Sequence, residues 1–252
     1  MIEPNPMKHL FLILVVVSLS GFAQTSEELE DSILKAVQLD TYFKRGLAKY
    51  DLEDYTGAIT DYNKVIQLNP YDASAYIYRG NAKDYLKDYS GAIADYSKAI
   101  QLNSDDYKAY FNRGLAKFRL EDYSGAIADY NKAIQLNPDY TAAYINRGVC
   151  KGYLEDYRGV IADNNKVLQL DPNDDRAYSN RGIAKHYLKD IKGAIADQNK
   201  AIQLNPNNAV AYFSRGRLKL KLNDKNGACL DWSKAGELGE PQSYIYIKDY
   251  CN

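Results

Sequence analysis

The chain has 252 residues, with 32 Lys and Arg against 33 Asp and Glu, so its formal net charge at neutral pH is −1. This balance provides no broad basic surface for phosphate groups, and we therefore expect no nucleic-acid partner. No Cys-x-x-Cys, His-Glu-x-x-His or glycine-rich phosphate loop is present, so the sequence indicates no catalytic site, no cofactor and no metal.

Residues 1–23 have the pattern of a secretory signal peptide. A charged start at Met7-Lys8-His9 precedes a mainly apolar run over residues 10–19, and small residues lead to Ala23. The apolar run is too short to cross a bilayer, which needs about 20 residues. We expect cleavage after Ala23 and a mature chain without a transmembrane segment. The alternative is a buried N-terminal helix, although the run lacks the polar face of an amphipathic helix.

After the signal, an Arg-Gly dipeptide recurs at intervals of 34 residues. A fixed period of this size is typical of a solenoid, because one helix pair cannot bury its apolar face alone. The six units, called repeats 1 to 6, are residues 39–72, 73–106, 107–140, 141–174, 175–208 and 209–242. Residues 24–38 precede them and are expected to contain a separate N-terminal helix, over Glu27 to Gln38, that covers repeat 1.

Each repeat is expected to contain two helices, A and B, joined by a turn. In repeat 3, Asp122 at position 16 is placed to cap helix B, and Asn137-Pro138 ends it because the residue before proline avoids the α region. The sequence therefore predicts an all-α fold: a right-handed α-solenoid of six helix-turn-helix repeats, closed by a C-terminal capping helix over residues 243–252. The apolar face of that capping helix is expected to be Tyr244, Ile247 and Tyr250.

Repeat 3 resembles the tetratricopeptide repeat. The match rests on an aromatic residue at position 4, Gly114 at position 8, Ala126 at position 20, Tyr130 at position 24 and a proline at position 32. Arginine and lysine replace the leucine and tyrosine of the family pattern at positions 7 and 11 in all six repeats. The resemblance implies a right-handed solenoid that binds a protein or peptide, and the Asn-Arg-Gly type of repeat is similar to that of exported bacterial proteins. It suggests the periplasm or the cell surface.

The arginine at position 7 has a matched aspartate at position 23 of every repeat. A carboxylate facing the arginine and the lysine four residues later would compensate their mutual repulsion. We therefore expect an ion pair between helices A and B of each repeat, and the alternative is a basic stripe for an anionic ligand. The expected pairs are Arg45 with Asp61, Arg79 with Asp95, Arg113 with Asp129, Arg147 with Asp163, Arg181 with Asp197, and Arg215 with Asp231.

In the family that the chain resembles, positions 2, 5, 6, 9, 12 and 13 of helix A line the binding groove. Position 6 is Asn112, Asn146 and Asn180 in three consecutive repeats, and an amide can pair with both groups of a peptide backbone. Apolar side chains at positions 5 and 9 would bury ligand side chains. They are Phe111, Leu115, Ile145, Val149 and Ile183. The alternative is that these apolar residues pack between neighbouring A helices and that the asparagines are tolerated surface residues.

Three cysteines complete the candidate residues. Cys150 stands where other repeats have alanine, which indicates a small buried thiol. Cys229 and Cys251 both belong to the C-terminal cap, and we expect either a disulfide in an oxidising compartment or two separate packed thiols.

Repeats 4 and 5 also carry Asn164 and Gln198 at position 24, where the other repeats have an aromatic ring. These amides need hydrogen-bond partners or water.

The sequence thus indicates an exported, non-catalytic scaffold that binds a peptide or protein in its groove. The alternative is a structural subunit of a cell-envelope assembly that binds partners by its convex face or its ends. The two differ in where the partner lies. Neither the partner nor the oligomeric state follows from the sequence.

Overall fold

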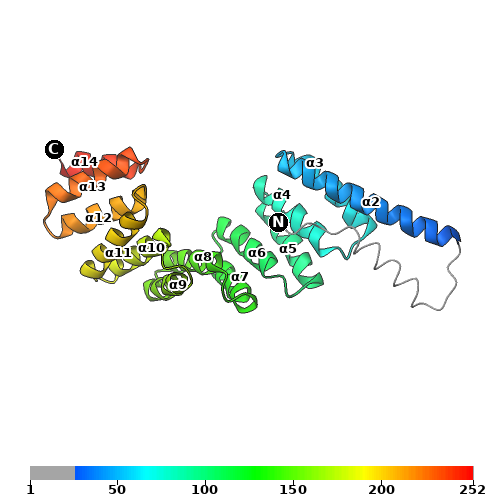
Figure 1. The fold of residues 1–252 in the computed structure, drawn as a ribbon, viewed down its shortest axis with the longest axis horizontal. Coiled ribbons are helices and arrows are strands. Elements are labelled where there is room, and N and C mark those ends of the chain that lie inside the picture. Colours follow the sequence, from blue (N-terminus) through cyan, green and yellow to red (C-terminus); the bar gives the residue numbers. More distant parts are fainter. Residues whose placement is uncertain (1–25, 252) are drawn as a thin grey trace. The chain divides into compact units, whose positions relative to one another are not determined.

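The computed structural model describes residues 26–251, and within this range every regular element is a helix. The chain divides into two compact units, Met1–Ala75 and Tyr76–Asn252. Figure 1 shows the helices in chain order. Their bounds are α2 Ser26–Asp51, α3 Tyr55–Leu68, α4 Ala73–Tyr85, α5 Tyr89–Leu102, α6 Tyr107–Arg119, α7 Tyr123–Leu136, α8 Thr141–Tyr153, α9 Tyr157–Leu170, α10 Asp175–Tyr187, α11 Ile191–Leu204, α12 Ala209–Lys221, α13 Lys225–Glu237 and α14 Gln242–Tyr250.

The helices pair as the 34-residue period predicts. In the first unit α2 packs against α3, and in the second unit α6 packs against α7, α8 against α9, α10 against α11 and α12 against α13. Within the second unit each pair also packs on the next, as α7 does on α8 and α9 on α10. The chain is therefore an α-solenoid of helix-turn-helix repeats. No helix among residues 26–251 is both long and apolar enough to span a membrane.

The turn between helices A and B has the same construction in all six repeats. In repeat 3 the carboxylate of Asp122 accepts a hydrogen bond from the Gly125 backbone N–H at 2.9 Å, which caps the first turn of α7. The preceding residue, Glu121, has a φ of 61°, in the left-handed region that non-glycine residues seldom adopt. Polar residues with a positive φ stand at this position in every repeat: Glu53, Lys87, Glu121, Glu155, Lys189 and Asn223.

The interior of a repeat is formed by small residues of both helices around the side chain at position 24. Ala126 and Ala133 of α7 are fully buried, as is Tyr130 between them. The Tyr130 ring lies so close to α6 that a Cβ on Gly114 would be 2.7 Å from its Cε1 atom. Glycine at position 8 thus allows an aromatic ring to lie directly against helix A.

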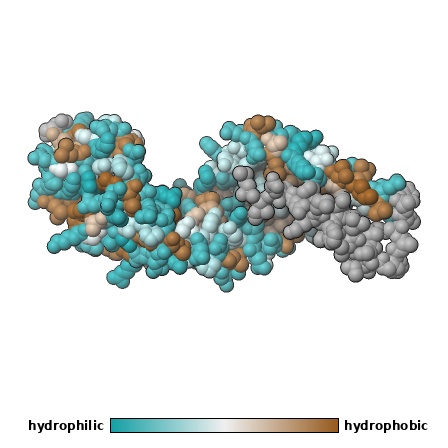
Figure 2. All heavy atoms as spheres, in the orientation of Figure 1, coloured by the Kyte–Doolittle hydropathy of each residue, from teal (hydrophilic) through white to brown (hydrophobic). Residues whose placement is uncertain are grey.

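The N-terminal segment differs from its prediction. Within residues 24–38 a separate helix was expected over Glu27 to Gln38, but α2 runs without interruption from Ser26 to Asp51 and includes helix A of repeat 1. No glycine or proline lies between Ser26 and Arg45, so nothing ends the helix at the repeat boundary. Its N-terminal half exposes several apolar side chains, visible as a patch on α2 in Figure 2. They are Leu29, Ile33, Leu34 and Val37.

The C-terminal helix α14 packs on α13, as expected of a cap. Its inward face is formed by Ser243, Tyr246 and Ile247, and the Tyr246 ring centroid lies 5.0 Å from that of Trp232. The predicted face was wrong at Tyr244, which is 61% exposed. The helix is rotated so that residues 243, 246, 247 and 250 share the inner side. Cys251, which follows it, forms a disulfide with Cys229 of α13.

Candidate binding surface on the A helices

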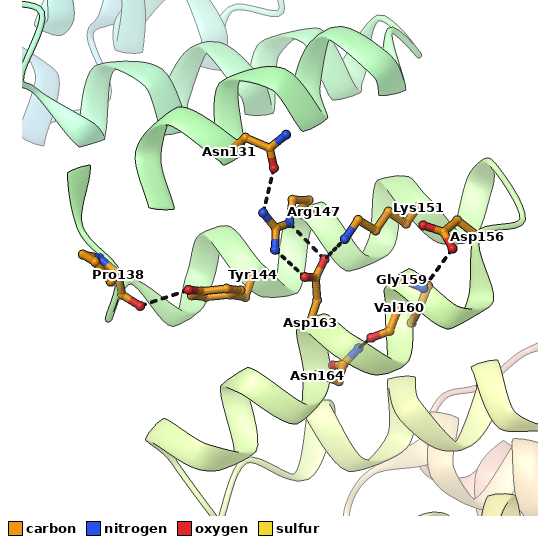
Figure 3. Close-up of polar contacts among 10 residues, drawn as sticks. All are labelled: Asn131, Pro138, Tyr144, Arg147, Lys151, Asp156, Gly159, Val160, Asp163 and Asn164. Carbon is orange, nitrogen blue, oxygen red and sulfur yellow. Dashed lines mark hydrogen bonds and ion pairs between the residues drawn. The ribbon is translucent and has the colours of Figure 1, made fainter. Parts of the chain in front are cut away.

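All six predicted arginine–aspartate pairs are present, and the position-11 lysine completes each of them. In repeat 4, Arg147 donates from Nε to Asp163 Oδ2 at 3.1 Å, and Lys151 Nζ lies 2.9 Å from the same oxygen. Figure 3 shows Asp163 of α9 between these two side chains of α8. The same contacts recur in the other repeats. The aspartates are buried, whereas most of the arginine and lysine side chains are partly exposed.

The arginine also connects its repeat to the preceding one. Arg147 donates from Nη1 to Asn131 Oδ1 of α7 at 2.7 Å, a contact drawn in Figure 3. Equivalent bonds join Arg113 to Ser97, Arg181 to Asn165 and Arg215 to Asn199. Each of these arginines thus holds two B helices at once, and a tyrosine ring at position 4 lies beside its guanidinium, at 5.3 Å for Arg147 and Tyr144.

These contacts favour the structural role of the charges over a basic stripe for an anionic ligand. In repeat 1 the hydrogen bond from Arg45 holds the pKa of Asp61 below its usual value, so this carboxylate stays ionised. Conversely, the bond to Asp197 raises the pKa of Arg181. Cations whose donors are already bonded to buried carboxylates have little capacity left for a ligand.

The three asparagines at position 6 share a place in the repeat but not an environment. Asn112 donates from Nδ2 to Asn81 Oδ1 of α4 at 3.1 Å. Asn146 donates to the carbonyl of Ala142 in its own helix at 2.8 Å. The Asn180 amide makes no hydrogen bond within residues 26–251, and it lines a pocket. The residue at position 9 of the preceding repeat differs in each case: it is an amide in repeat 2, but leucine and valine in repeats 3 and 4.

The five apolar residues predicted for the groove divide into two groups. Phe111 and Leu115 pack in the core cluster around Tyr130, and Ile145 packs in the cluster around Val167. These three residues therefore belong to core clusters that include residues of their own B helix and of the next A helix, whereas the alternative expected packing between neighbouring A helices alone. Val149 and Ile183 instead lie together with Asn180 at the pocket, where Val149 is 36% exposed.

This pocket lies between helices α8 and α10, over the start of α9, and has a volume of about 410 Å³. No lining side chain is charged. The lining residues are Gly148, Val149, Gly152, Tyr153, Tyr157, Val160, Asn180, Ile183, Ala184 and Tyr187.

Two of the tyrosines at the pocket are stacked on each other. The rings of Tyr157 and Tyr187 are 4.5 Å apart and parallel to within 2°. Tyr153 stacks in the same way on Tyr123 of the preceding repeat, at 4.6 Å. Tyr153 and Tyr187 nevertheless remain 59% and 50% exposed. These tyrosines at positions 13 and 17 were not among the predicted site residues, although aromatic residues recurring at groove position 13 were a usable signal.

The space beside the position-8 glycine is less filled in repeat 4, where position 24 is Asn164. In repeats 1 to 3 the tyrosine at position 24 lies against the glycine at position 8, as Tyr130 does against Gly114. In repeat 4 the atom nearest a Cβ on Gly148 would be Asn164 Nδ2, at 3.5 Å, which is an ordinary contact. Asn164 bonds the Val160 carbonyl in its own helix at 2.8 Å, as Figure 3 shows. Its Oδ1 atom is buried without a hydrogen-bond partner.

Gln198 at the same position of repeat 5 leaves no such space. Its Nε2 atom donates to the Ser179 carbonyl at 3.0 Å, and Trp232 makes the equivalent bond from Nε1 to the Phe213 carbonyl at 3.3 Å. Nε2 would also lie 2.7 Å from a Cβ on Gly182. The longer amide therefore takes the place of an aromatic ring, whereas asparagine is one carbon too short to do so.

Within residues 26–251, no group of His, Cys, Asp and Glu side chains could hold a metal ion. His186 is buried, and burial together with Lys221 and Arg217 lowers its pKa. Cys150 is also buried, as predicted, which raises the pKa of its thiol to about 11. Neither side chain has the partners of a catalytic group.

Family models match several parts of the chain. The tetratricopeptide repeat model matches residues 107–140, a second model described as the TPR repeat matches residues 46–83 and 85–121, and a third, again described as tetratricopeptide repeat, matches residues 175–208. Together these matches cover about half of the chain. No curated protein matches it.

Solved structures match most of the chain. A MamA protein is 25% identical, with a TM-score of 0.64 over 68% of this chain and 94% of that one. YrrB, described as a TPR protein with an unusual peptide-binding site, is 21% identical, with a TM-score of 0.61 over 75% and 97%. PilF of Pseudomonas aeruginosa is 17% identical, with a TM-score of 0.71 over 85% and 98%. The last two likenesses concern the fold.

Proposed function

Because the chain belongs to the tetratricopeptide repeat family, we propose that it is a non-catalytic scaffold that binds a protein or peptide segment on the face formed by its A helices. One observation carries this choice of face: the uncharged pocket between α8 and α10 brings together three of the predicted groove residues, Val149, Asn180 and Ile183. Pockets with an apolar lining and a few polar groups are the usual form of binding sites.

The location of the partner can be tested in the native envelope. A photo-crosslinking amino acid replaces Val149 on α8 in one variant, and Ala162, which is exposed on α9, in a control variant. Mass spectrometry should find partner adducts from position 149 and few from position 162. Adducts from position 162 alone would contradict binding on the A helices.

The second candidate is a structural subunit of a cell-envelope assembly that is bound through its ends or its convex face. The exposed apolar side chains of α2, such as Ile33 and Val37, favour this function because soluble helices usually bury such a stripe. A crosslinker at Ile33 separates the two proposals. Adducts there, without adducts at position 149, favour the assembly.

The proposal includes export to the periplasm or the cell surface after removal of residues 1–23, which lie outside the described residues. Two observations support it: the signal-like pattern of the first 23 residues and the disulfide between Cys229 and Cys251, since disulfides persist in oxidising compartments. N-terminal sequencing of protein recovered from fractionated cells should give Gln24 as the first residue. A cytoplasmic protein that still begins at Met1 would contradict export.

A further inference from the structure

A tyrosine side chain in repeat 2 shows what the space beside helix A can hold. The Tyr96 ring lies against Gly80, where a Cβ would be 2.8 Å from Cε1, and its hydroxyl donates to Asn81 Oδ1 at 2.8 Å. The same oxygen accepts a bond from Asn112 of the next repeat at 3.1 Å. The ring, the position-9 amide and the next position-6 amide thus form one closed network.

At the equivalent positions of repeats 4 and 5, no tyrosine ring fills the space beside helix A. Gly148, Val149 and Asn180 correspond to Gly80, Asn81 and Asn112, and all three line the pocket. Asn164 stands at the position that Tyr96 has in repeat 2. Its side chain does not fill the space beside helix A as that ring does, because its amide is bonded to the Val160 carbonyl in its own helix. The side-chain amide of Asn180 has no hydrogen bond to any described residue, so its donors and its acceptor are available to a ligand.

We infer that this pocket is a specificity pocket for one aromatic side chain of an extended peptide, and that the Asn180 amide bonds the ligand backbone beside it. This inference rests on the proposed function, since it concerns the same face of the A helices. The ligand ring takes the place that the chain's own tyrosine fills in repeat 2. The pocket is a consequence of asparagine at position 24.

The lining favours an aromatic ring over other side chains. Three tyrosines, Tyr153, Tyr157 and Tyr187, line the pocket, and aromatic rings pair with a further ring in stacked or edge-to-face geometry. A charged side chain would lose its hydration without a partner, because no lining residue carries a charge.

The probe is N-acetyl-phenylalaninamide, which combines one aromatic ring with two peptide-like amides. Its binding to the full mature chain is followed by NMR, with N-acetyl-alaninamide and N-acetyl-lysinamide as comparison probes. We expect dissociation in the millimolar range, as is usual for a ligand of this size, with shifts at Val149, Asn180 and Ile183. The two comparison probes should bind at least roughly tenfold more weakly.

The variant Asn164→Tyr should close the pocket and reduce binding of the aromatic probe by roughly tenfold or more. It introduces the residue that repeats 1 to 3 carry at this position, so the fold is retained, and circular dichroism checks this. The matched control is Gln198→Tyr, the same type of change in the repeat that has no such space beside its position-8 glycine; it should leave probe binding unchanged. Asn164→Gln, which copies repeat 5, should also reduce binding.

Equal binding of the three probes would overturn the inference, as would undiminished binding to a folded Asn164→Tyr variant. Either result leaves the crosslinking test at Val149 unaffected, because a partner can bind the A helices without using this pocket. Conversely, absent crosslinks combined with selective binding of the aromatic probe would contradict only the proposed function.

Discussion

The side-chain amide of Asn164 donates to the carbonyl oxygen of Val160, four residues earlier in the same helix, at 2.8 Å. At this position in repeat 3, Tyr130 instead lies against the glycine of the facing helix. This local difference determines how much space remains beside the A helix. The distance from a Cβ built on the position-8 glycine to its nearest neighbour measures that space.

Gly148→Ala should therefore be tolerated, whereas Gly114→Ala should not. A Cβ at position 148 would meet its nearest neighbour at 3.5 Å, but one at position 114 would lie 2.7 Å from the Tyr130 ring. Replacing a helical glycine by alanine gains about 1 kcal/mol where space allows, while overpacking a filled site costs roughly 1 to 3 kcal/mol. Urea denaturation should show an unchanged or raised midpoint for the first variant and a lowered one for the second. Similar losses in both would mean that repeat 4 is as closely packed as repeat 3.

The buried carboxylates predict a large loss of stability when one of them is neutralised. Asp129→Asn leaves the cations of Arg113 and Lys117 facing an uncharged amide, and breaking a buried pair in this way costs roughly 3 kcal/mol. The measurement is the free energy of unfolding in urea. Arg158→Gln, which removes an exposed charge on α9, is the control and should change it by less than about 0.5 kcal/mol.

The depressed pKa of Asp61 predicts the direction of the pH dependence. Its folded pKa lies below the unfolded value of about 3.9, so its ionised form stabilises the fold above that pH. The contribution is lost as the pH falls through the folded pKa, when the carboxylate is protonated. The stability difference between the wild type and Asp61→Asn should accordingly be full at neutral pH and shrink in acid. A difference that grows on acidification would have the wrong sign.

The disulfide predicts a local effect at the C-terminus. It closes a sequence separation of 22 residues between α13 and the end of α14, which corresponds to about 3 kcal/mol in the chain-entropy model. Reduction, or the double change Cys229→Ser with Cys251→Ser, should speed hydrogen exchange in α14 and leave the amides of α6 to α9 protected. Uniform loss of protection would show that the cap controls the whole solenoid.

The repeat architecture could be predicted because each of its causes is local and recurs six times. The 34-residue period, the position-16 aspartate and the pairing of position 7 with position 23 each require no knowledge of the remaining chain. The continuity of α2 was missed because the family frame suggested a boundary that no helix-breaking residue marks. The rotation of α14 depends on its contact with Trp232, which a helical period alone does not specify.

The candidate site was predictable only in part. The family pattern led to Val149, Asn180 and Ile183. It assumes, however, that residues at the same position of different repeats have the same neighbours. Whether an asparagine at position 6 is free depends on the residue at position 9 of the preceding repeat and on the side chain at position 24. These contacts join residues about 15 to 31 positions apart, as in the Tyr96, Asn81 and Asn112 network, and they differ from repeat to repeat.

The same contacts predict that the three asparagines contribute unequally to binding. Once crosslinking has identified a partner segment, Asn180→Ala should weaken its affinity about fivefold, the loss of one hydrogen bond worth ~1 kcal/mol. Asn146→Ala should have a smaller effect because its donor is bonded to the Ala142 carbonyl. Asn112→Ala should lower stability rather than affinity, since its amide is bonded to Asn81. The triple variant should then bind about as weakly as Asn180→Ala alone in a titration calorimeter. A ladder of three equivalent amides would instead give losses that accumulate, and that result would place all three side chains on the ligand.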